Sequence, residues 1–138
     1  MASDVRLSTA ARNAIADALV AQLGASCLID IYSGTKPAGP GTAITSQVKL
    51  ATLTGNATFA PASSGGVATA NTITDGTGSA GAAGGTTATW FRASNSGGTA
   101  VMDGTVGLTG CDCNINNTNI ATGQTVHATS MTITAPNA

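Results

Sequence analysis

Residues 87–106, TATWFRASNSGGTAVMDGTV, predict a β-hairpin and set the fold class of the chain. The two arms, 87–93 and 99–106, are rich in threonine, valine and aromatic residues, which favour pleated strands. The five residues between them, SNSGG, are of the types that make tight turns. The chain is therefore expected to be built from antiparallel strands that are joined by short connections.

Further short strands are predicted on both sides of this hairpin, each bounded by Gly, Pro, Asn, Asp or Ser. They cover residues 27–32, 48–53, 67–74, 114–120 and 125–135. The alternation in the last of these strands puts Thr125, His127, Thr129, Met131 and Ile133 on one face. Residues 75–86 are mostly Gly, Ala, Thr and Ser, have little to bury, and are expected to form a mobile surface loop.

One helix is predicted, over about residues 8–23. Leu7, Ala11, Ile15, Leu19 and Leu23 recur every four positions and predict an apolar stripe. Ser8 is placed to cap the N-terminus of this helix, and Gly24 to close its C-terminus. The stripe is expected to cover a sheet, or else to dock another chain.

With no helical segment between the strands, the sequence predicts a mainly β fold. We expect an antiparallel β-sandwich or jelly roll with one N-terminal α-helix. The length of 138 residues fits a single domain over 1–138, with a helical segment at 1–24 and the β-sandwich at 25–138.

The composition offers little chemistry. The chain has 11 charged residues, no glutamate and one histidine, and 78 of its 138 positions are Ala, Gly, Thr or Ser. An active site needs acids, bases or metal ligands that converge, so a binding or assembly role is favoured over catalysis. A net charge of −1 with dispersed Lys and Arg argues against a nucleic-acid partner, and the lack of a long apolar run argues against a membrane partner.

The core is expected to be thin, because Leu, Ile, Val and Phe together number only 24. A small domain with a thin core often takes additional stability from a partner subunit. Cys27, Cys111 and Cys113 are an odd number of thiols and cannot make a complete set of intrachain disulfides, so reduced thiols are expected.

Three short motifs suggest ligands, and each has a simpler explanation. Residues 76–81 match G-x-G-x-x-G but continue into AAGG instead of a helix, so we expect no dinucleotide there. Cys111, Cys113 and His127 are zinc-ligand types at an unsuitable spacing. Asp112, Asn114 and Asn116 alternate like calcium ligands but lack the acidic residue that should follow, and turn formation explains them. No cofactor, metal or catalytic residue is assigned.

The single aromatic cluster of the sequence is Trp90-Phe91-Arg92, on a strand where Trp90 and Arg92 share one face and Phe91 takes the other. If Phe91 enters the core, Trp90 and Arg92 form an outward anchor pair of the kind enriched at interfaces. If the strand is turned the other way, Trp90 is a packing residue. The sequence leaves both alternatives open.

Several segments together resemble small virion proteins of tailed phages and prophages. They are Arg6-Leu7-Ser8 with the following helix, and the stretches IYSG (31–34), GVATAN (66–71), ATWFR (88–92) and VMDGTV (101–106). The resemblance spans nearly the whole chain and is closest to capsid cement, or decoration, proteins with a jelly-roll body. It implies a non-enzymatic subunit that binds the outside of a major capsid shell, often as a dimer or trimer, after assembly in the cytoplasm of a bacterial host.

The expected function is therefore to cement neighbouring major capsid subunits on the exterior of a phage capsid. The expected partners are the major capsid protein and the chain itself, a homodimer being favoured over a homotrimer. The candidate interface residues are Trp90, Arg92, Tyr32, Ile133 and Pro136.

Two alternatives stay open. One is a phage tail or fibre component that binds cell-surface glycan by stacking on Trp90 and Tyr32. The other is a small hydrolase that uses His127 or a pair of aspartates.

Overall fold

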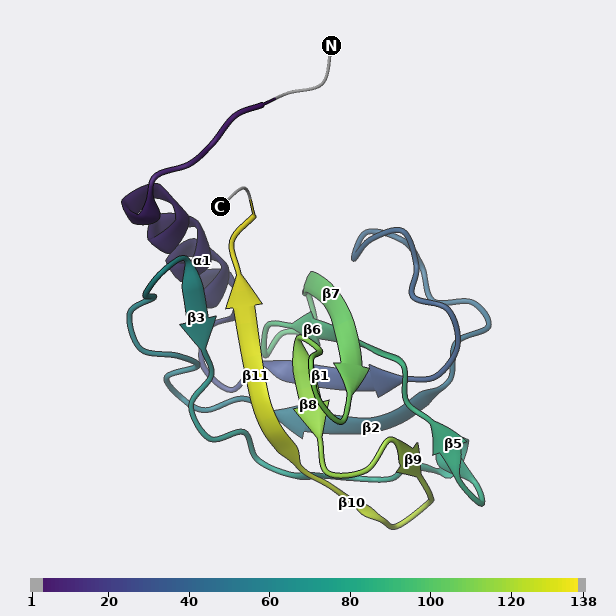
Figure 1. Cartoon of the computed structure of the whole chain (residues 1–138). Helices are drawn as coiled ribbons and strands as arrows, with labels where there is room; N and C mark the ends of the chain where they lie inside the picture. The colour runs from purple at the N-terminus through teal and green to yellow at the C-terminus, as the bar shows by residue number, and fades with distance from the viewer. Residues whose placement is uncertain (1–3, 137–138) are drawn as a thin grey trace.

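The computed structural model describes residues 4–136, which form one α-helix and eleven short strands (Figure 1). The helix α1 spans Thr9–Leu23. The strands are β1 (Leu28–Tyr32), β2 (Lys49–Thr54), β3 (Val67–Thr69), β4 (Gly76–Thr77), β5 (Thr86–Thr87), β6 (Trp90–Ser94), β7 (Ala100–Gly107), β8 (Cys113–Ile115), β9 (Asn119–Ile120), β10 (Thr125–Val126) and β11 (Ala128–Thr134). The expected mainly β fold with one N-terminal helix is confirmed.

The hairpin predicted from residues 87–106 is β6 and β7. These strands pair antiparallel with Phe91 opposite Gly104 and Arg92 opposite Asp103. The turn closes as its composition predicts, since the Asn95 side chain accepts a hydrogen bond from the Thr99 N–H and Gly98 takes a positive φ of 88°. Local sequence was sufficient to define this element.

Seven strands form one strongly curled sheet in the order β2-β1-β6-β7-β8-β11-β3. Its two halves face each other across the core in the manner of a sandwich, and the change of direction occurs between β7 and β8 (Figure 1). The pairing of β7 with β8 is parallel, so the sheet is mixed and not wholly antiparallel as expected. One continuous sheet of this order does not establish the jelly roll that the resemblance implies.

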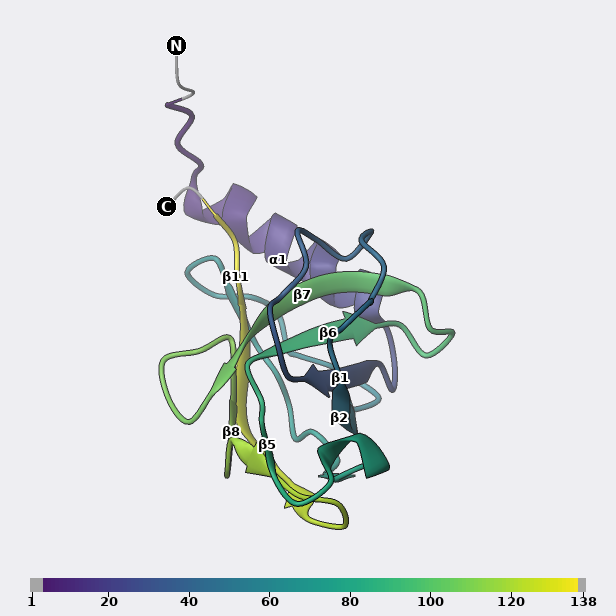
Figure 2. The ribbon, with the colours of Figure 1, turned by 90° about the vertical axis from the view of Figure 1, so that its right-hand side faces the viewer.

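The helix α1 has the predicted caps but a different buried face. The Ser8 hydroxyl accepts a hydrogen bond from the Ala11 N–H at 3.1 Å, and Gly24 donates to Val20 O. Ala16 and Leu23 are buried, whereas Ile15 is 36% exposed. In a helix with 3.6 residues per turn, each step of four residues moves the side chain by about 40° around the axis. A stripe of residues spaced by four therefore winds around the helix, and only part of it faces the sheet. Figure 2 shows α1 behind β7 and β11, which it contacts together with β3.

Residues 75–86 were expected to be a mobile surface loop that buries little; most of them are exposed, but the segment also forms short regular elements and has buried positions. Gly76, Gly78 and Ala82 are buried, β4 pairs with β10, and a short 3-10 turn forms at Ala80–Ala82. A Cβ on Gly76 would overlap Thr52 O, and one on Gly78 would overlap Ala121 O. Glycine is therefore needed at these two positions because other segments of the backbone pack closely against them. This packing explains the G-x-G-x-x-G match.

The strand predicted over 125–135 is interrupted by an irregularity in its pairing with β8, between Ala128 and Ser130. Val126 and Ala128 are buried before this point, and Met131 and Ile133 after it. An extra residue in one strand shifts the alternation by one position. Thr125, His127, Thr129, Met131 and Ile133 therefore do not share one face, contrary to the prediction.

Two other predicted strands are shorter than expected. Of 67–74 only Val67–Thr69 is a strand, and Thr74 makes an isolated bridge with Thr54. Residues 114–120 divide into the end of β8 and β9, because the Asn117 side chain accepts the Asn119 N–H and makes a turn. Within residues 4–136 no helix has the length and apolar character needed to cross a bilayer.

Candidate functional site

Trp90 lies under a loop, residues 33–48, that covers the outer face of β6. Its ring stacks on Tyr32 with centroids 4.5 Å apart and an interplanar angle of 13°. The indole Nε1 donates to Ser33 O at 3.3 Å, and Trp90 is only 1% exposed. The two rings form a small second core on the side of the sheet that faces away from Phe91.

Arg92 fastens this loop to the sheet. Its Nη1 donates to Thr42 O at 2.9 Å and its Nη2 to Gly39 O at 3.0 Å. On the other side the guanidinium meets Asp103, through Nε at 2.7 Å and Nη2 at 2.9 Å. These hydrogen bonds to Asp103 are the main reason that the pKa of Arg92 lies above its ordinary value. The guanidinium is therefore occupied on both sides by groups of its own chain.

Phe91 enters the main core, so β6 is buried on both faces. The orientation with Phe91 inward is the observed one, but Trp90 and Arg92 do not form an outward anchor pair. The structure thus places Trp90, Arg92 and Tyr32 together, as packing and fastening residues beneath the loop. Their ring faces and guanidinium are not open to a partner while the loop 33–48 is in this position.

The other two candidate interface residues lie at the end of β11. Ile133 is 5% exposed and belongs to the main core, so it offers little surface to a partner. Pro136 follows β11 and is exposed. Of the five candidate interface residues, Pro136 alone lies on the surface.

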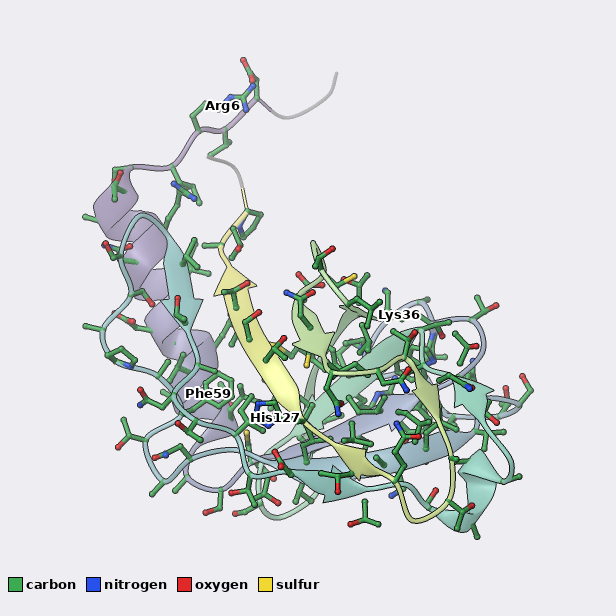
Figure 3. The ribbon with its side chains drawn as sticks, turned by 60° about the horizontal axis from the view of Figure 1, so that its bottom comes forward. Arg6, Lys36, Phe59 and His127 are labelled. Atoms are coloured by element: carbon green, nitrogen blue, oxygen red, sulfur yellow. The ribbon has the colours of Figure 1, made fainter. Side chains whose placement is uncertain are left out.

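His127 lies between β10 and β11, at the start of the latter (Figure 3), and its ring contacts Asp75. The Nδ1 atom is 2.6 Å from Asp75 Oδ1, and both side chains are about half exposed. A carboxylate in this position orients the imidazole, as in nucleophilic sites. Among the hydrogen bonds of residues 4–136, none joins this ring to a serine or threonine hydroxyl.

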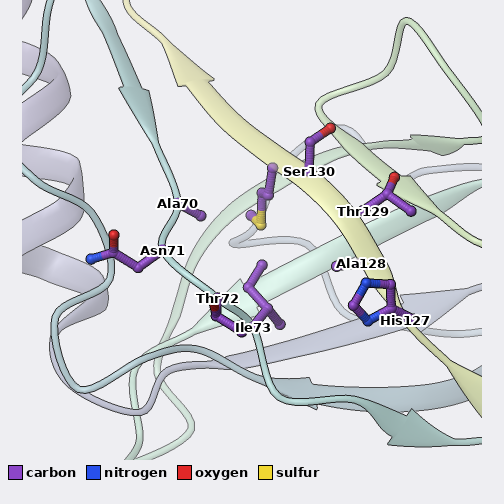
Figure 4. Close-up of a pocket in the computed structure, with 9 residues that line it drawn as sticks. Ala70, Asn71, Thr72, Ile73, His127, Ala128, Thr129 and Ser130 are labelled. Atoms are coloured by element: carbon purple, nitrogen blue, oxygen red, sulfur yellow. The ribbon is translucent and has the colours of Figure 1, made fainter.

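A shallow pocket of about 240 Å³ adjoins His127, where the chain after β3 separates from β11 (Figure 4). Its polar lining comes from Asn71, Thr72, Thr129 and Ser130 together with the histidine. The lining holds no second ionisable group beside His127. The pocket is therefore a polar depression with one titratable side chain.

Each of the six aspartates has a partner within the chain. The pairs are Asp4 with Arg6, Asp17 with Ser63, Asp30 with Thr52, Asp75 with His127, Asp103 with Arg92 and Asp112 with Thr105. Within residues 4–136, no three His, Cys or Asp side chains gather in the manner of a metal centre. Except for the local and exposed pair of Asp4 with Arg6, these contacts join segments of the fold.

Asp112, Asn114 and Asn116 make turn and strand contacts, as the simpler explanation predicted. Asp112 Oδ2 accepts from the N–H and the hydroxyl of Thr105, both at 2.9 Å. The side-chain oxygens of Asn114 and Asn116 accept backbone N–H groups of Cys111 and His127. Cys27, Cys111 and Cys113 are all free thiols, as expected.

Sequence reasoning missed Asp103 as the partner of Arg92. The hairpin register contained the signal, because a turn at 94–98 places these two residues directly opposite each other. It also missed the loop that covers Trp90, whose docking depends on contacts between residues some fifty positions apart in the chain.

Comparison of the chain with protein-family models, with curated proteins and with solved structures finds no match.

Proposed function

We propose that this chain is a non-enzymatic structural protein of a phage virion, which binds the outside of the capsid and cements neighbouring major capsid subunits. The sequence resemblance described above suggests this role. The observation that carries it is the commitment of all six carboxylates and of the Arg92 guanidinium to partners inside the chain. Polar groups used in this way stabilise a scaffold and leave little for chemistry on a substrate.

The proposal includes self-association, with a homodimer favoured over a homotrimer. Apolar side chains that remain exposed support it, such as Val5 at 60% and Leu108 at 57%. A second subunit would bury part of this surface and add the stability that a thin core does not supply.

The test is binding to empty shells that are assembled from the major capsid protein of the phage or prophage proposed to encode this chain. We expect co-sedimentation with the shells and a rise in the temperature at which they break open. Pro136→Asp should weaken this binding, whereas Pro61→Asp, which alters another exposed proline, should not. A chain that stays in the supernatant at every concentration would overturn the proposal.

Two further measurements separate the alternatives. Glycan-array binding without shell binding would select the tail or fibre component. Hydrolysis of an ester or glycoside that His127→Ala abolishes, with the fold intact, would select the hydrolase, whose histidine already has Asp75 to orient it.

A further inference from the structure

The strand β7 has an edge that is free over most of its length. On one side β7 pairs with β6 from Ala100 to Thr105, but on the other side it pairs with β8 at Val106 and Gly107 alone. The ladder of β11 with β8 ends at Met131. Asp112, just before β8, still accepts the Thr132 N–H of β11 with its backbone oxygen and the Thr105 N–H of β7 with its carboxylate, so the free edges begin beyond Thr132 and Thr105. Beyond the short strand β8, the edges of β7 and β11 therefore face a common gap.

Backbone groups point into this gap. The Val106 N–H donates to Thr89 O and so points toward β6. Backbone N–H and C=O groups point to opposite sides of a strand at successive residues. Asp103, three residues before Val106, therefore turns its N–H and C=O to the free edge. In β11, Ala70 donates to Met131 O on the β3 side, so Thr134 turns its backbone groups away from β3. Unpaired edges of this kind accept an added strand.

A groove of about 190 Å³ lies along these edges, and its lining is both apolar and polar, the polar part coming from Asp103, Asp112, Thr132 and Thr134. We call it the β7–β11 groove and define it by Leu19, Phe91, Met102, Gly104, Asp112 and Ile133. Gly104 keeps the floor low because it has no side chain. The groove therefore combines apolar side chains with hydrogen-bonding rims, as an extended peptide requires.

Residues 4–7 have the pattern of a strand that fits such a groove. Asp4 and Arg6 meet at 3.2 Å on one side of this segment, which leaves Val5 and Leu7 for the opposite side. That ion pair is the only polar contact of residues 4–7 within the described part of the chain, and Arg6 lies well away from the body (Figure 3). We call residues 4–7 the N-terminal arm.

We propose that the N-terminal arm of a second copy lies in the β7–β11 groove as an added strand. Val5 and Leu7 would contact the apolar side chains of the groove, and Arg6 would approach the Asp112 carboxylate at the rim. Four extended residues span about 13 Å, which suits the free edge of β7. If each copy gives its arm to the other, the exchange closes as a symmetric dimer. This inference rests on the self-association part of the proposed function and names the surfaces involved.

The first experiment measures the dimer by sedimentation equilibrium of the full chain. We expect Leu7→Asp to weaken association more than about tenfold, because it places a charge against the apolar side chains of the groove. Val48→Asp changes an exposed apolar residue outside the arm and the groove, and should leave association unchanged. Thr134→Pro removes an N–H that faces the groove and not β3, and should weaken association as well.

The second experiment locates the arm by disulfide formation. Chains with Val5→Cys and chains with Thr134→Cys, both carrying Cys111→Ser, are mixed and oxidised. We expect a covalent pair of the two chains, and none when Val48→Cys replaces Val5→Cys. A chain carrying both new cysteines that cross-links only within itself at every dilution would place the arm in its own groove and overturn the inference.

The outcomes separate this inference from the proposed function. If the wild type dimerises and Leu7→Asp dimerises equally well, the arm is not the contact, although self-association stands. If the wild type is monomeric at every concentration, both the arm exchange and self-association fail. Binding to empty shells is measured independently and tests the cement role in either case.

Discussion

The ring of Phe91 lies against Gly104, its antiparallel partner on β7, and leaves no space for a side chain at that position. An aromatic ring over a cross-strand glycine fills the volume that the glycine leaves and fixes the register of the pair. Phe91 is 1% exposed, so its ring has little room to move. The middle of the hairpin depends on this contact.

Gly104→Ala is therefore expected to destabilise the protein by about 1–3 kcal/mol, as overpacking of a core does. The added Cβ would overlap the Phe91 ring. Urea unfolding measures the loss. Gly84→Ala is the matched control, since a Cβ there meets no atom within 4 Å, and it should change stability by less than about 0.5 kcal/mol. Equal effects at the two positions would contradict the assigned packing.

Arg92→Met should lower the free energy of unfolding by about 3–5 kcal/mol, because it leaves the buried Asp103 carboxylate without its cation. The Asp103 side chain is 2% exposed. It should also release the loop 33–48, since the carbonyls of Gly39 and Thr42 lose their donors. Hydrogen exchange at the Thr42 amide measures this release. Lys49→Met breaks the more exposed pair with Asp30 and is expected to cost less than about 1 kcal/mol. Unchanged exchange in Arg92→Met would show that other contacts hold the loop.

The three thiols should differ in reactivity. Burial raises the pKa of Cys113 to about 12, and burial also raises the pKa of Cys27. Because the thiolate is the reacting form, neither should react with a disulfide reagent near pH 8 in the folded protein. Cys111 is partly exposed and should react first, giving one fast thiol per chain. Cys111→Ser should remove the fast phase, and a fast thiol that persists in this variant would contradict the assignment.

The Asp17 carboxyl should make the free energy of unfolding depend on pH in the acid range. The side chain and the backbone N–H of Ser63 lower the pKa of the Asp17 carboxyl below its ordinary value of 3.8. A carboxyl with a lowered pKa in the folded state stabilises the protein above its unfolded-state pKa, and this contribution is lost as pH falls through the folded-state value. Wild type should therefore exceed Asp17→Asn in stability at pH 6, and the difference should shrink below about pH 4. Urea unfolding over this range checks it, and a constant difference would exclude the linkage.

The candidate site could be predicted only in part. The sequence indicated that Trp90, Arg92 and Tyr32 matter, and the structure places the three together. It did not indicate that the loop 33–48 covers them, because the hydrogen bonds from Arg92 to Gly39 and Thr42 join segments about fifty residues apart. Whether an aromatic side chain is an anchor or a packing residue depends on what lies above it, and local pattern does not contain that information.

Short-range chemistry by itself determined the helix caps at Ser8 and Gly24, the turn at 94–98 and the mainly β class. Each of these depends on backbone preferences and hydrogen bonds between residues a few positions apart. Only the tertiary structure decided which face of α1 is buried, that residues 75–86 pack through buried glycines, and that the sheet turns at a parallel pair of strands. The reason is that these features arise from contacts between distant segments, where close packing of backbone and side chains selects one arrangement among many that the local pattern allows.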